Sequence, residues 1–207
     1  MKKNIITLSI LVTIVYSCNE NKSSTDHTKM QHNIDTADNI SKQKPTLMQS
    51  MMDMDAAMAN TKYTNIPDKD FATMMLIHHK GAINMIDILL ENGKNATLKT
   101  LATKMKADQL KEISTFTSFL DSTKDATIVN DFGAKLMSSM DGMMNAPHKM
   151  DGSIDEQFTS MMIPHHQGAV DMAKLYLPFA KDATLKILAQ NIIAAQTKEI
   201  DEMRQIK

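Results

Sequence analysis

The sequence predicts an all-α protein whose core is a bundle of four long helices, built from two copies of one helical hairpin. Only 6 Gly and 5 Pro occur among 207 residues, aromatic residues make up 4%, and no recurring alternation of β-branched residues predicts strands. The segment Phe71–Met85, FATMMLIHHKGAINM, returns 87 positions later as FTSMMIPHHQGAVDM, without a gap. A unit repeated at a fixed spacing predicts two structural copies that pack together.

The N-terminal residues are expected to direct the chain to the cell envelope. Residues 1–17 contain two lysines and an apolar run over 5–15, which together indicate an export signal, and the run is too short to span a bilayer. The sequence VYS before Cys18 resembles the lipobox of a lipoprotein signal peptide. We therefore expect lipidation at Cys18, a membrane partner through that lipid, and a location on the periplasmic or outer-membrane face.

The rest of the chain divides into a tether and one helical domain. Residues 18–46 are polar with little to bury, so they are interpreted as a flexible tether. Residues 47–207 form the predicted bundle domain, with repeats at 47–121 and 134–207. The formal net charge of −1, without a basic stripe, argues against nucleic acid as a partner.

Methionine clusters in two related segments that each precede a long helix. The chain has 20 Met, and Leu47–Ala59 and Leu136–Asn145 are both rich in them. Each segment is expected to form one short helix whose methionines can face the bundle. The methionines concerned are Met51, Met54, Met58, Met140, Met143 and Met144.

Apolar residues at alternating spacings of three and four predict the long helices. We expect them near 68–91, 96–120, 155–178 and 183–205. Their expected N-caps, in chain order, are Asn65, Asn95, Ser153 and Asp182. The stripes require a common core that includes Phe71 and Phe158, and the two repeats should be related by an approximate two-fold axis.

Polar residues interrupt each apolar stripe. If each pair of long helices folds back as a hairpin, His78 faces Gln109 and Met75 faces Glu112. The second copy then places His165 opposite Gln196 and Met162 opposite Glu199. Adjacent histidines lie about 100° apart on a helix, so His79 and His166 must point to the flank, toward a neighbouring helix or solvent.

This pattern predicts a metal site, because every His of the two pairs has a Met one helical turn before it. Thioether and imidazole together suit copper, as Cu(I) or Cu(II), better than Mg or Ca. The candidate ligands are His78, His79, His165, His166, Met74, Met75, Met85, Met161, Met162 and Met172. The residues expected to orient them or to act as extra ligands are Gln109, Glu112, Gln196 and Glu199. The alternative is a core in which Gln or Glu bonds the buried His and Met fills space.

The same residues resemble a bacterial family known as domain of unknown function 305. Its pattern has an acidic start, Phe, a Met-rich step, His-His, Gly or Ala and Met, followed by Ala-x-x-Gln-x-x-Glu-Ile. Residues 68–113 and 155–200 both match it. The resemblance implies a ferritin-like helical bundle in the cell envelope and, for some members, periplasmic copper binding through Met and His in copper tolerance.

The leading functional hypothesis is copper sequestration or handling in metal tolerance, without catalysis. One alternative is a Met-rich helical interaction module without metal. A second is a ferritin-like di-metal oxidase, but such enzymes need Glu-x-x-His, and no His of the two pairs has an acidic residue three positions earlier. The metal ion is the expected partner, and a homo-oligomer or a metal-delivery partner is left open.

Overall fold

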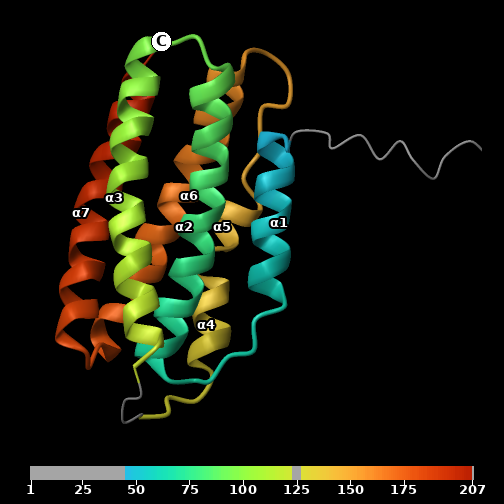
Figure 1. Ribbon diagram of the computed structural model, residues 1–207. Helices are drawn as coiled ribbons and strands as arrows, with labels where there is room; N and C mark the ends of the chain where they lie inside the picture. The colour runs from blue at the N-terminus through green and yellow to red at the C-terminus, as the bar shows by residue number, and fades with distance from the viewer. Residues whose placement is uncertain (1–44, 123–126, 207) are drawn as a thin grey trace, which may run out of the picture. The chain divides into compact units, whose positions relative to one another are not determined.

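Two helical hairpins form a four-helix bundle in the computed structural model, which describes residues 45–122 and 127–206 (Figure 1). The first hairpin consists of α2 and α3 and the second of α6 and α7. Their bounds are Pro67–Asn92, Ala96–Leu120, Ile154–Tyr176 and Ala183–Gln205. Every end lies within two residues of its predicted position. The described residues contain helices and no strand, so the predicted all-α bundle of two repeated hairpins is confirmed.

Short helices pack on the bundle beside α2 and α6 (Figure 1). They are α1 (Leu47–Ala59), α4 (Phe132–Ser138), α5 (Asp141–Met144) and the 3₁₀ helix η1 (Leu177–Phe179). The α1 prediction is confirmed at both ends. The predicted single helix at 136–145 is wrong, because the chain turns between α4 and α5.

The break between α4 and α5 has a local cause. The Ser139 hydroxyl donates to the carbonyl of Leu136 at 2.6 Å, a side-chain bond that competes with helix continuation. Gly142 then weakens the helix that follows. As a result Met140 and Met143 are buried, whereas Met144 is 40% exposed and does not face the bundle as predicted.

Three of the four predicted N-caps are confirmed. Asn95, Ser153 and Asp182 each accept a hydrogen bond from the backbone three residues on. Asn65 is not a cap: its φ is 58°, and the helix begins at Pro67, whose fixed φ and missing N–H suit a first helical position.

The two repeats are joined by reciprocal contacts at their first turns. The carboxylate of Asp155 accepts hydrogen bonds from the backbone N–H groups of residues 94–95, the shortest at 2.9 Å. The carboxylate of Asp68 accepts bonds from residues 181–182, both at 3.1 Å. Each acidic residue therefore holds the hairpin loop of the other repeat, which agrees with the predicted two-fold relation.

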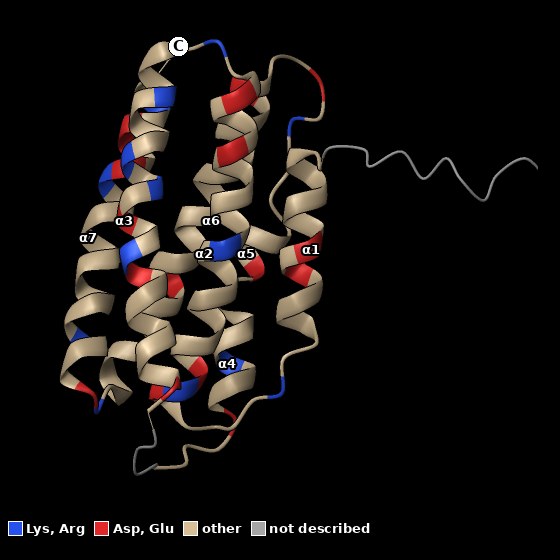
Figure 2. Cartoon of the chain, viewed as in Figure 1, with Lys and Arg blue, Asp and Glu red and all other residues tan. Residues whose placement is uncertain are grey.

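One core runs through both repeats, and it contains both Phe71 and Phe158 as predicted. The Phe71 ring stacks on Tyr176, with ring centroids 4.0 Å apart, and meets Phe116 edge-on at 5.9 Å. This aromatic group ties α2 to α6 and to α3. The first charged residues along α3 are all basic, and acidic and basic residues both occur farther along the helix (Figure 2).

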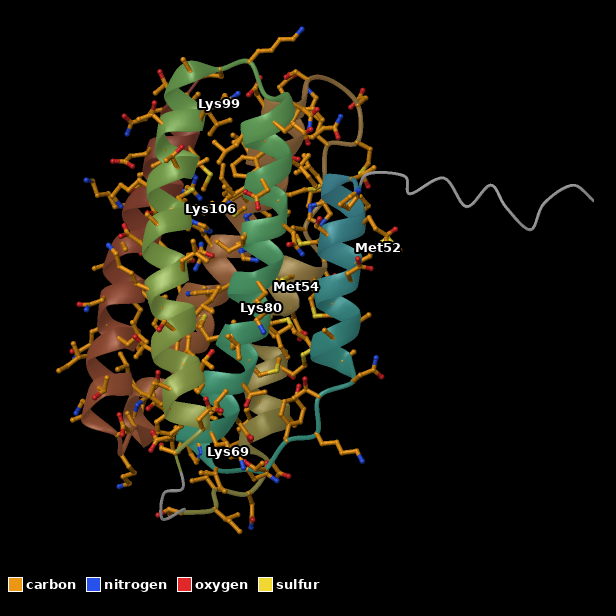
Figure 3. The ribbon with its side chains drawn as sticks, viewed as in Figure 1. Met52, Met54, Lys69, Lys80, Lys99 and Lys106 are labelled. Atoms are coloured by element: carbon orange, nitrogen blue, oxygen red, sulfur yellow. The ribbon has the colours of Figure 1, made fainter. Side chains whose placement is uncertain are left out.

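The Met-rich helices contact the bundle at two glycines that follow the His pairs. A Cβ on Gly81 would lie 2.7 Å from the sulfur of Met54, and a Cβ on Gly168 would lie 3.1 Å from that of Met143. Figure 3 shows Met54 directed from α1 toward α2, whereas Met52 lies on the outer side. Each glycine thus lets a thioether approach the helix two residues beyond a His pair.

The predicted signal peptide, Cys18 and the tether as far as residue 44 lie outside the described residues. Among the helices that the structure does describe, none has the length and apolar character needed to cross a bilayer.

Candidate metal centre

The four histidines of the two His pairs gather where α2 and α6 meet. His78, His79, His165 and His166 are all fully buried. The rings of His78 and His165 lie face to face across the two repeats, with centroids 3.6 Å apart and planes tilted by 37°. The sequence predicted one pair of histidines per repeat. It did not predict that the two pairs meet, because no motif states which helices of two repeats become neighbours.

Carboxylates from the outer helices hold the two flanking histidines. His79 donates its Nε2–H to Glu112 of α3 at 2.7 Å, and His166 donates its Nε2–H to Glu199 of α7 at 3.1 Å. The flanking histidines therefore meet neighbouring helices. The predicted facing of Met75 with Glu112, and of Met162 with Glu199, is corrected: the hairpin register brings each Glu to the buried ring that needs a hydrogen-bond partner.

The glutamines behave differently from the prediction. Gln109 and Gln196 are buried at equivalent positions, one turn before the glutamates. Neither amide has a hydrogen-bond partner among the described residues. They do not bond His78 and His165: the His165 Nε2–H donates to the backbone carbonyl of His78 at 3.2 Å, and neither ring nitrogen of His78 has a partner.

The Nδ1 atom is unpartnered in all four histidines, and His78 also leaves its Nε2 unpartnered. Metal-binding histidines usually donate one ring N–H to a carboxylate or carbonyl and coordinate through the other nitrogen. His79 and His166 have this arrangement with a carboxylate, and His165 has it with a carbonyl. Their Nδ1 atoms are thus the candidate ligand atoms.

The central histidines are neutral at physiological pH. Burial, reinforced by the neighbouring His165, His79 and His166, holds the pKa of His78 well below its ordinary value. Burial likewise lowers the pKa of His165, with the nearby His166 and His79 adding to the effect. Neutral imidazole is the form that binds metal, so protonation does not block these rings near pH 7.

The predicted thioether ligands all lie in the hydrophobic core. Six of them, all fully buried, are Met74, Met75, Met85, Met161, Met162 and Met172. Within 45–122 and 127–206, no three His, Cys, Asp or Glu side chains are grouped so that they could hold a metal ion. His and carboxylate side chains alone therefore do not form a three-ligand site within these residues, and the role of these methionines stays a prediction.

Lys104 belongs to the site although no sequence motif indicates it. Its Nζ lies 3.2 Å from Glu199 Oε1, on the side of the carboxylate that His166 does not use. Burial raises the pKa of Glu199, but the bonds to His166 and Lys104 outweigh it and leave that pKa lowered. Glu199 is thus an ionised carboxylate between a histidine and a lysine.

The buried neutral histidines predict that the metal-free fold loses stability in mild acid. The unfolded chain protonates His78 and His165 near their ordinary pKa of about 6.5, whereas the folded chain resists protonation. The contribution of the two neutral rings to the free energy of unfolding is therefore fully present above about pH 6.5. It falls as the pH drops toward the lowered pKa values, by up to about 1.4 kcal/mol per pH unit for each ring. Urea unfolding with a chelator at about pH 7.5 and about pH 5.5 measures this slope.

The control is His148→Gln, which removes a histidine outside the cluster and leaves both central rings in place. His78→Gln should reduce the slope. Equal stability at both pH values would show that the central rings do not resist protonation in the folded chain.

The chain is similar to two solved structures and to one viral protein. Two solved structures are similar: "CopM in the Ag-bound form (by soaking)", with a TM-score of 0.53 and 28% identity, and "CopM in the Cu(I)-bound form", with 0.51 and 27%. Each match covers 70% of this chain and 95% of the other. Uncharacterized protein L153 of Acanthamoeba polyphaga mimivirus is 44% identical over 52 residues, which are 25% of this chain and 34% of that protein. The match thus spans about a third of that viral protein.

The repeat pattern itself matches a described family. The family model described as Domain of unknown function (DUF305) matches residues 14–120 and 68–207, which together include both copies of the His-His motif. The chain therefore belongs to the DUF305 family.

Proposed function

We propose that this protein binds a soft metal ion, Cu(I) above all, as cargo, and sequesters it or hands it on without catalysis. One observation carries the proposal: two fully buried histidines each donate Nε2–H to a glutamate and leave Nδ1 unpartnered. A carboxylate that orients an imidazole in this way raises its basicity toward a metal. Most of the unpartnered buried side-chain polar atoms of the described residues belong to the four histidines and to Gln109 and Gln196.

The donor set favours a soft ion. Because His and carboxylate groups alone do not complete a site, a bound ion would take thioether sulfur for its remaining ligands. Met75 and Met162 lie one helical turn before His79 and His166, within reach of the same ion. The similarity to CopM structures in Ag-bound and Cu(I)-bound forms supports the same class of ion.

A purely structural role for the cluster explains the geometry less well. Buried polar groups in native cores are nearly always hydrogen-bonded, and an unpartnered one costs about 1–3 kcal/mol. Here the amides of Gln109 and Gln196 and the Nδ1 atoms of four histidines are all buried without partners. An ion with its ligands would use several of these groups at once.

The proposed role is binding in the cell envelope. Catalysis by a di-metal centre is disfavoured because no His of the two pairs follows an acidic residue at the Glu-x-x-His spacing. The export signal and Cys18 support a lipid-anchored location.

The proposal is tested by titrating the full chain with Cu(I), Ag(I) and Zn(II) against chelators of known affinity. We expect Cu(I) and Ag(I) to bind more tightly than Zn(II), because only the first two depend strongly on thioethers. A Met75→Leu, Met162→Leu variant should keep its fold, since such volume-conserving swaps usually cost less than about 1.5 kcal/mol each.

That variant should lose most of the preference for Cu(I) and Ag(I) over Zn(II). Met105→Leu is the control: it makes the same exchange in the same core, at a fully buried methionine of α3 that is not a candidate ligand. Absence of Cu(I) and Ag(I) binding by the parent chain would refute the proposed function.

A further inference from the structure

The two His–Glu pairs are related by the repeat but do not have the same surroundings. Glu199 uses one oxygen for His166 and the other for Lys104, at 3.2 Å, and its side chain is 5% exposed. Within the described part of the chain, Glu112 has His79 as its one partner, and it is 15% exposed. The position equivalent to Lys104 in the second repeat is Asn191, which carries no charge.

The cluster has two ends, one at His79 with Glu112 and one at His166 with Glu199, and Lys104 brings a positive charge to the His166 end. Burial lowers the pKa of Lys104, but its hydrogen bonds to Asp108 and Glu199 outweigh this and leave the pKa raised, so the side chain is an ammonium at neutral pH. A metal ion at His166 would therefore meet Glu199 with its charge offset by Lys104. An ion at His79 would meet Glu112 with its charge intact.

The hydrogen-bond lengths agree with this difference. The His79–Glu112 bond is 2.7 Å, whereas the His166–Glu199 bond is 3.1 Å. A carboxylate shared with a lysine is a weaker acceptor for an imidazole N–H, so the imidazole becomes a weaker base toward a metal. Charge and hydrogen bonding thus both weaken the His166 end.

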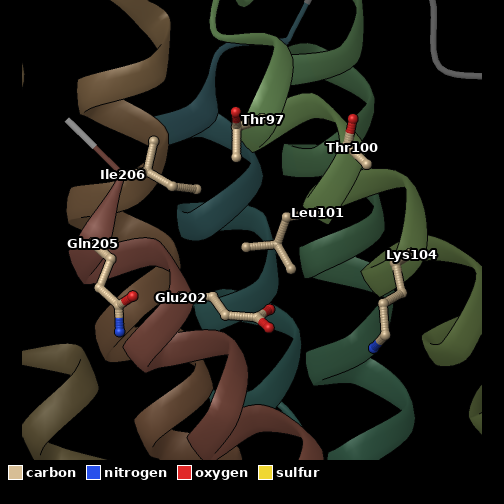
Figure 4. Close-up of a pocket in the computed structure, with 7 residues that line it drawn as sticks. All are labelled: Thr97, Thr100, Leu101, Lys104, Glu202, Gln205 and Ile206. Carbon is tan, nitrogen blue, oxygen red and sulfur yellow. The ribbon is translucent and has the colours of Figure 1, made fainter.

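Lys104 also lines a pocket that reaches the surface. The pocket has a volume of about 620 Å³ and lies between α3 and α7, with Lys104 on one wall and Glu202 on the other (Figure 4). The Lys104 side chain is 56% exposed. Dissolved salt therefore reaches the ammonium that contacts the buried carboxylate.

We propose that Lys104 is a positioning residue that makes the two ends unequal, so that a soft metal ion binds more tightly at the His79 end than at the His166 end. This inference rests on the proposed metal binding. Lys104 would act through Glu199 and not as a ligand, and the chemical class of the ion remains Cu(I) or Ag(I).

Two single variants of the full chain isolate the two ends. His166→Gln leaves His79, and His79→Gln leaves His166; in both, the Gln amide can still donate to the glutamate. With Ag(I) as the probe, which is redox-inert under assay conditions, His166→Gln should bind more tightly than His79→Gln. Adding Lys104→Met should raise the Ag(I) affinity of the His79→Gln chain by about tenfold, at the low end of what outer partners of metal ligands contribute. It should leave the His166→Gln chain unchanged.

Two further substitutions distinguish charge from structure. Lys104→Arg keeps the positive charge and should give no gain. Lys106 lies on the same helix but pairs with Asp87 and not with the glutamates (Figure 3). Lys106→Met removes the same charge and should therefore also give no gain. The gain from Lys104→Met should shrink as salt is raised, because the ammonium is partly screened. A structural defect would not depend on salt in this way.

Failure of the inference and failure of the proposed function have different signatures. If the parent chain binds no Ag(I), the metal-binding proposal itself fails. If the parent binds Ag(I) but the two single variants bind equally, or Lys104→Met changes both alike, metal binding stands and the role of Lys104 is refuted.

Discussion

Replacing His79 and His166 together by Gln is expected to weaken Cu(I) and Ag(I) binding by more than about 100-fold while the helical bundle persists. Even the outer partners of metal ligands typically contribute 10- to 100-fold in affinity, so loss of two ligand atoms should exceed that range. The fold should survive because the Gln amide can donate to Glu112 or Glu199, as the Nε2–H of each ring does now. The substitution therefore removes Nδ1 and retains the hydrogen bond.

Competition titration measures the affinity, and circular dichroism with urea unfolding measures the fold. His148→Gln is the matched control, since it removes one imidazole that does not belong to the cluster. A double variant that binds Cu(I) as tightly as the parent would exclude the flanking histidines as ligands.

The fold could be predicted almost completely from the sequence because its causes are local and repeated. The apolar stripes and the residues at their ends set the helices, and the gap-free repeat required two equivalent hairpins. The predictions of helix ends fail where a particular side chain overrides the apolar pattern. Pro67 moved a helix start away from Asn65, and the hydroxyl of Ser139 interrupted a short helix that composition alone predicted as continuous.

The candidate site was predictable in its residue types but not in its pairings. Spacing shows that His79 must point to the flank of its helix, but it does not show which side chain on a neighbouring helix reaches it. A register estimate from loop length was in error by about one helical turn, which is enough to exchange Gln109 for Glu112 as the residue beside the His pair. Lys104 belongs to the other repeat from Glu199, so no spacing within either repeat could indicate their contact.

The same limit applies to the first-turn aspartates. Sequence position alone assigns Asp68 and Asp155 to the first turns of their own helices, where a negative charge is favourable. In the structure each accepts hydrogen bonds from the hairpin loop of the opposite repeat. The same packing of one repeat against the other brings His78 against His165.

Phe71→Ala is expected to lower the free energy of unfolding by about 3–5 kcal/mol, the usual cost of removing a fully buried aromatic ring. Phe71 stacks on Tyr176 of the other repeat and meets Phe116 of its own hairpin. Its loss should therefore loosen the contact between the repeats as well as the core of one hairpin. Urea unfolding of the metal-free chain, followed by circular dichroism, provides the measurement.

The repeat supplies a matched control for this experiment. Phe158 is the equivalent residue and is equally buried, but the positions equivalent to Tyr176 and Phe116 hold Leu89 and Met203. Phe158→Ala should therefore cost about 1–2 kcal/mol less than Phe71→Ala, since each aromatic pair adds about 0.5–1.5 kcal/mol beyond burial. Equal costs would show that burial alone accounts for Phe71, and that the stack on Tyr176 contributes nothing of its own to holding the two repeats together.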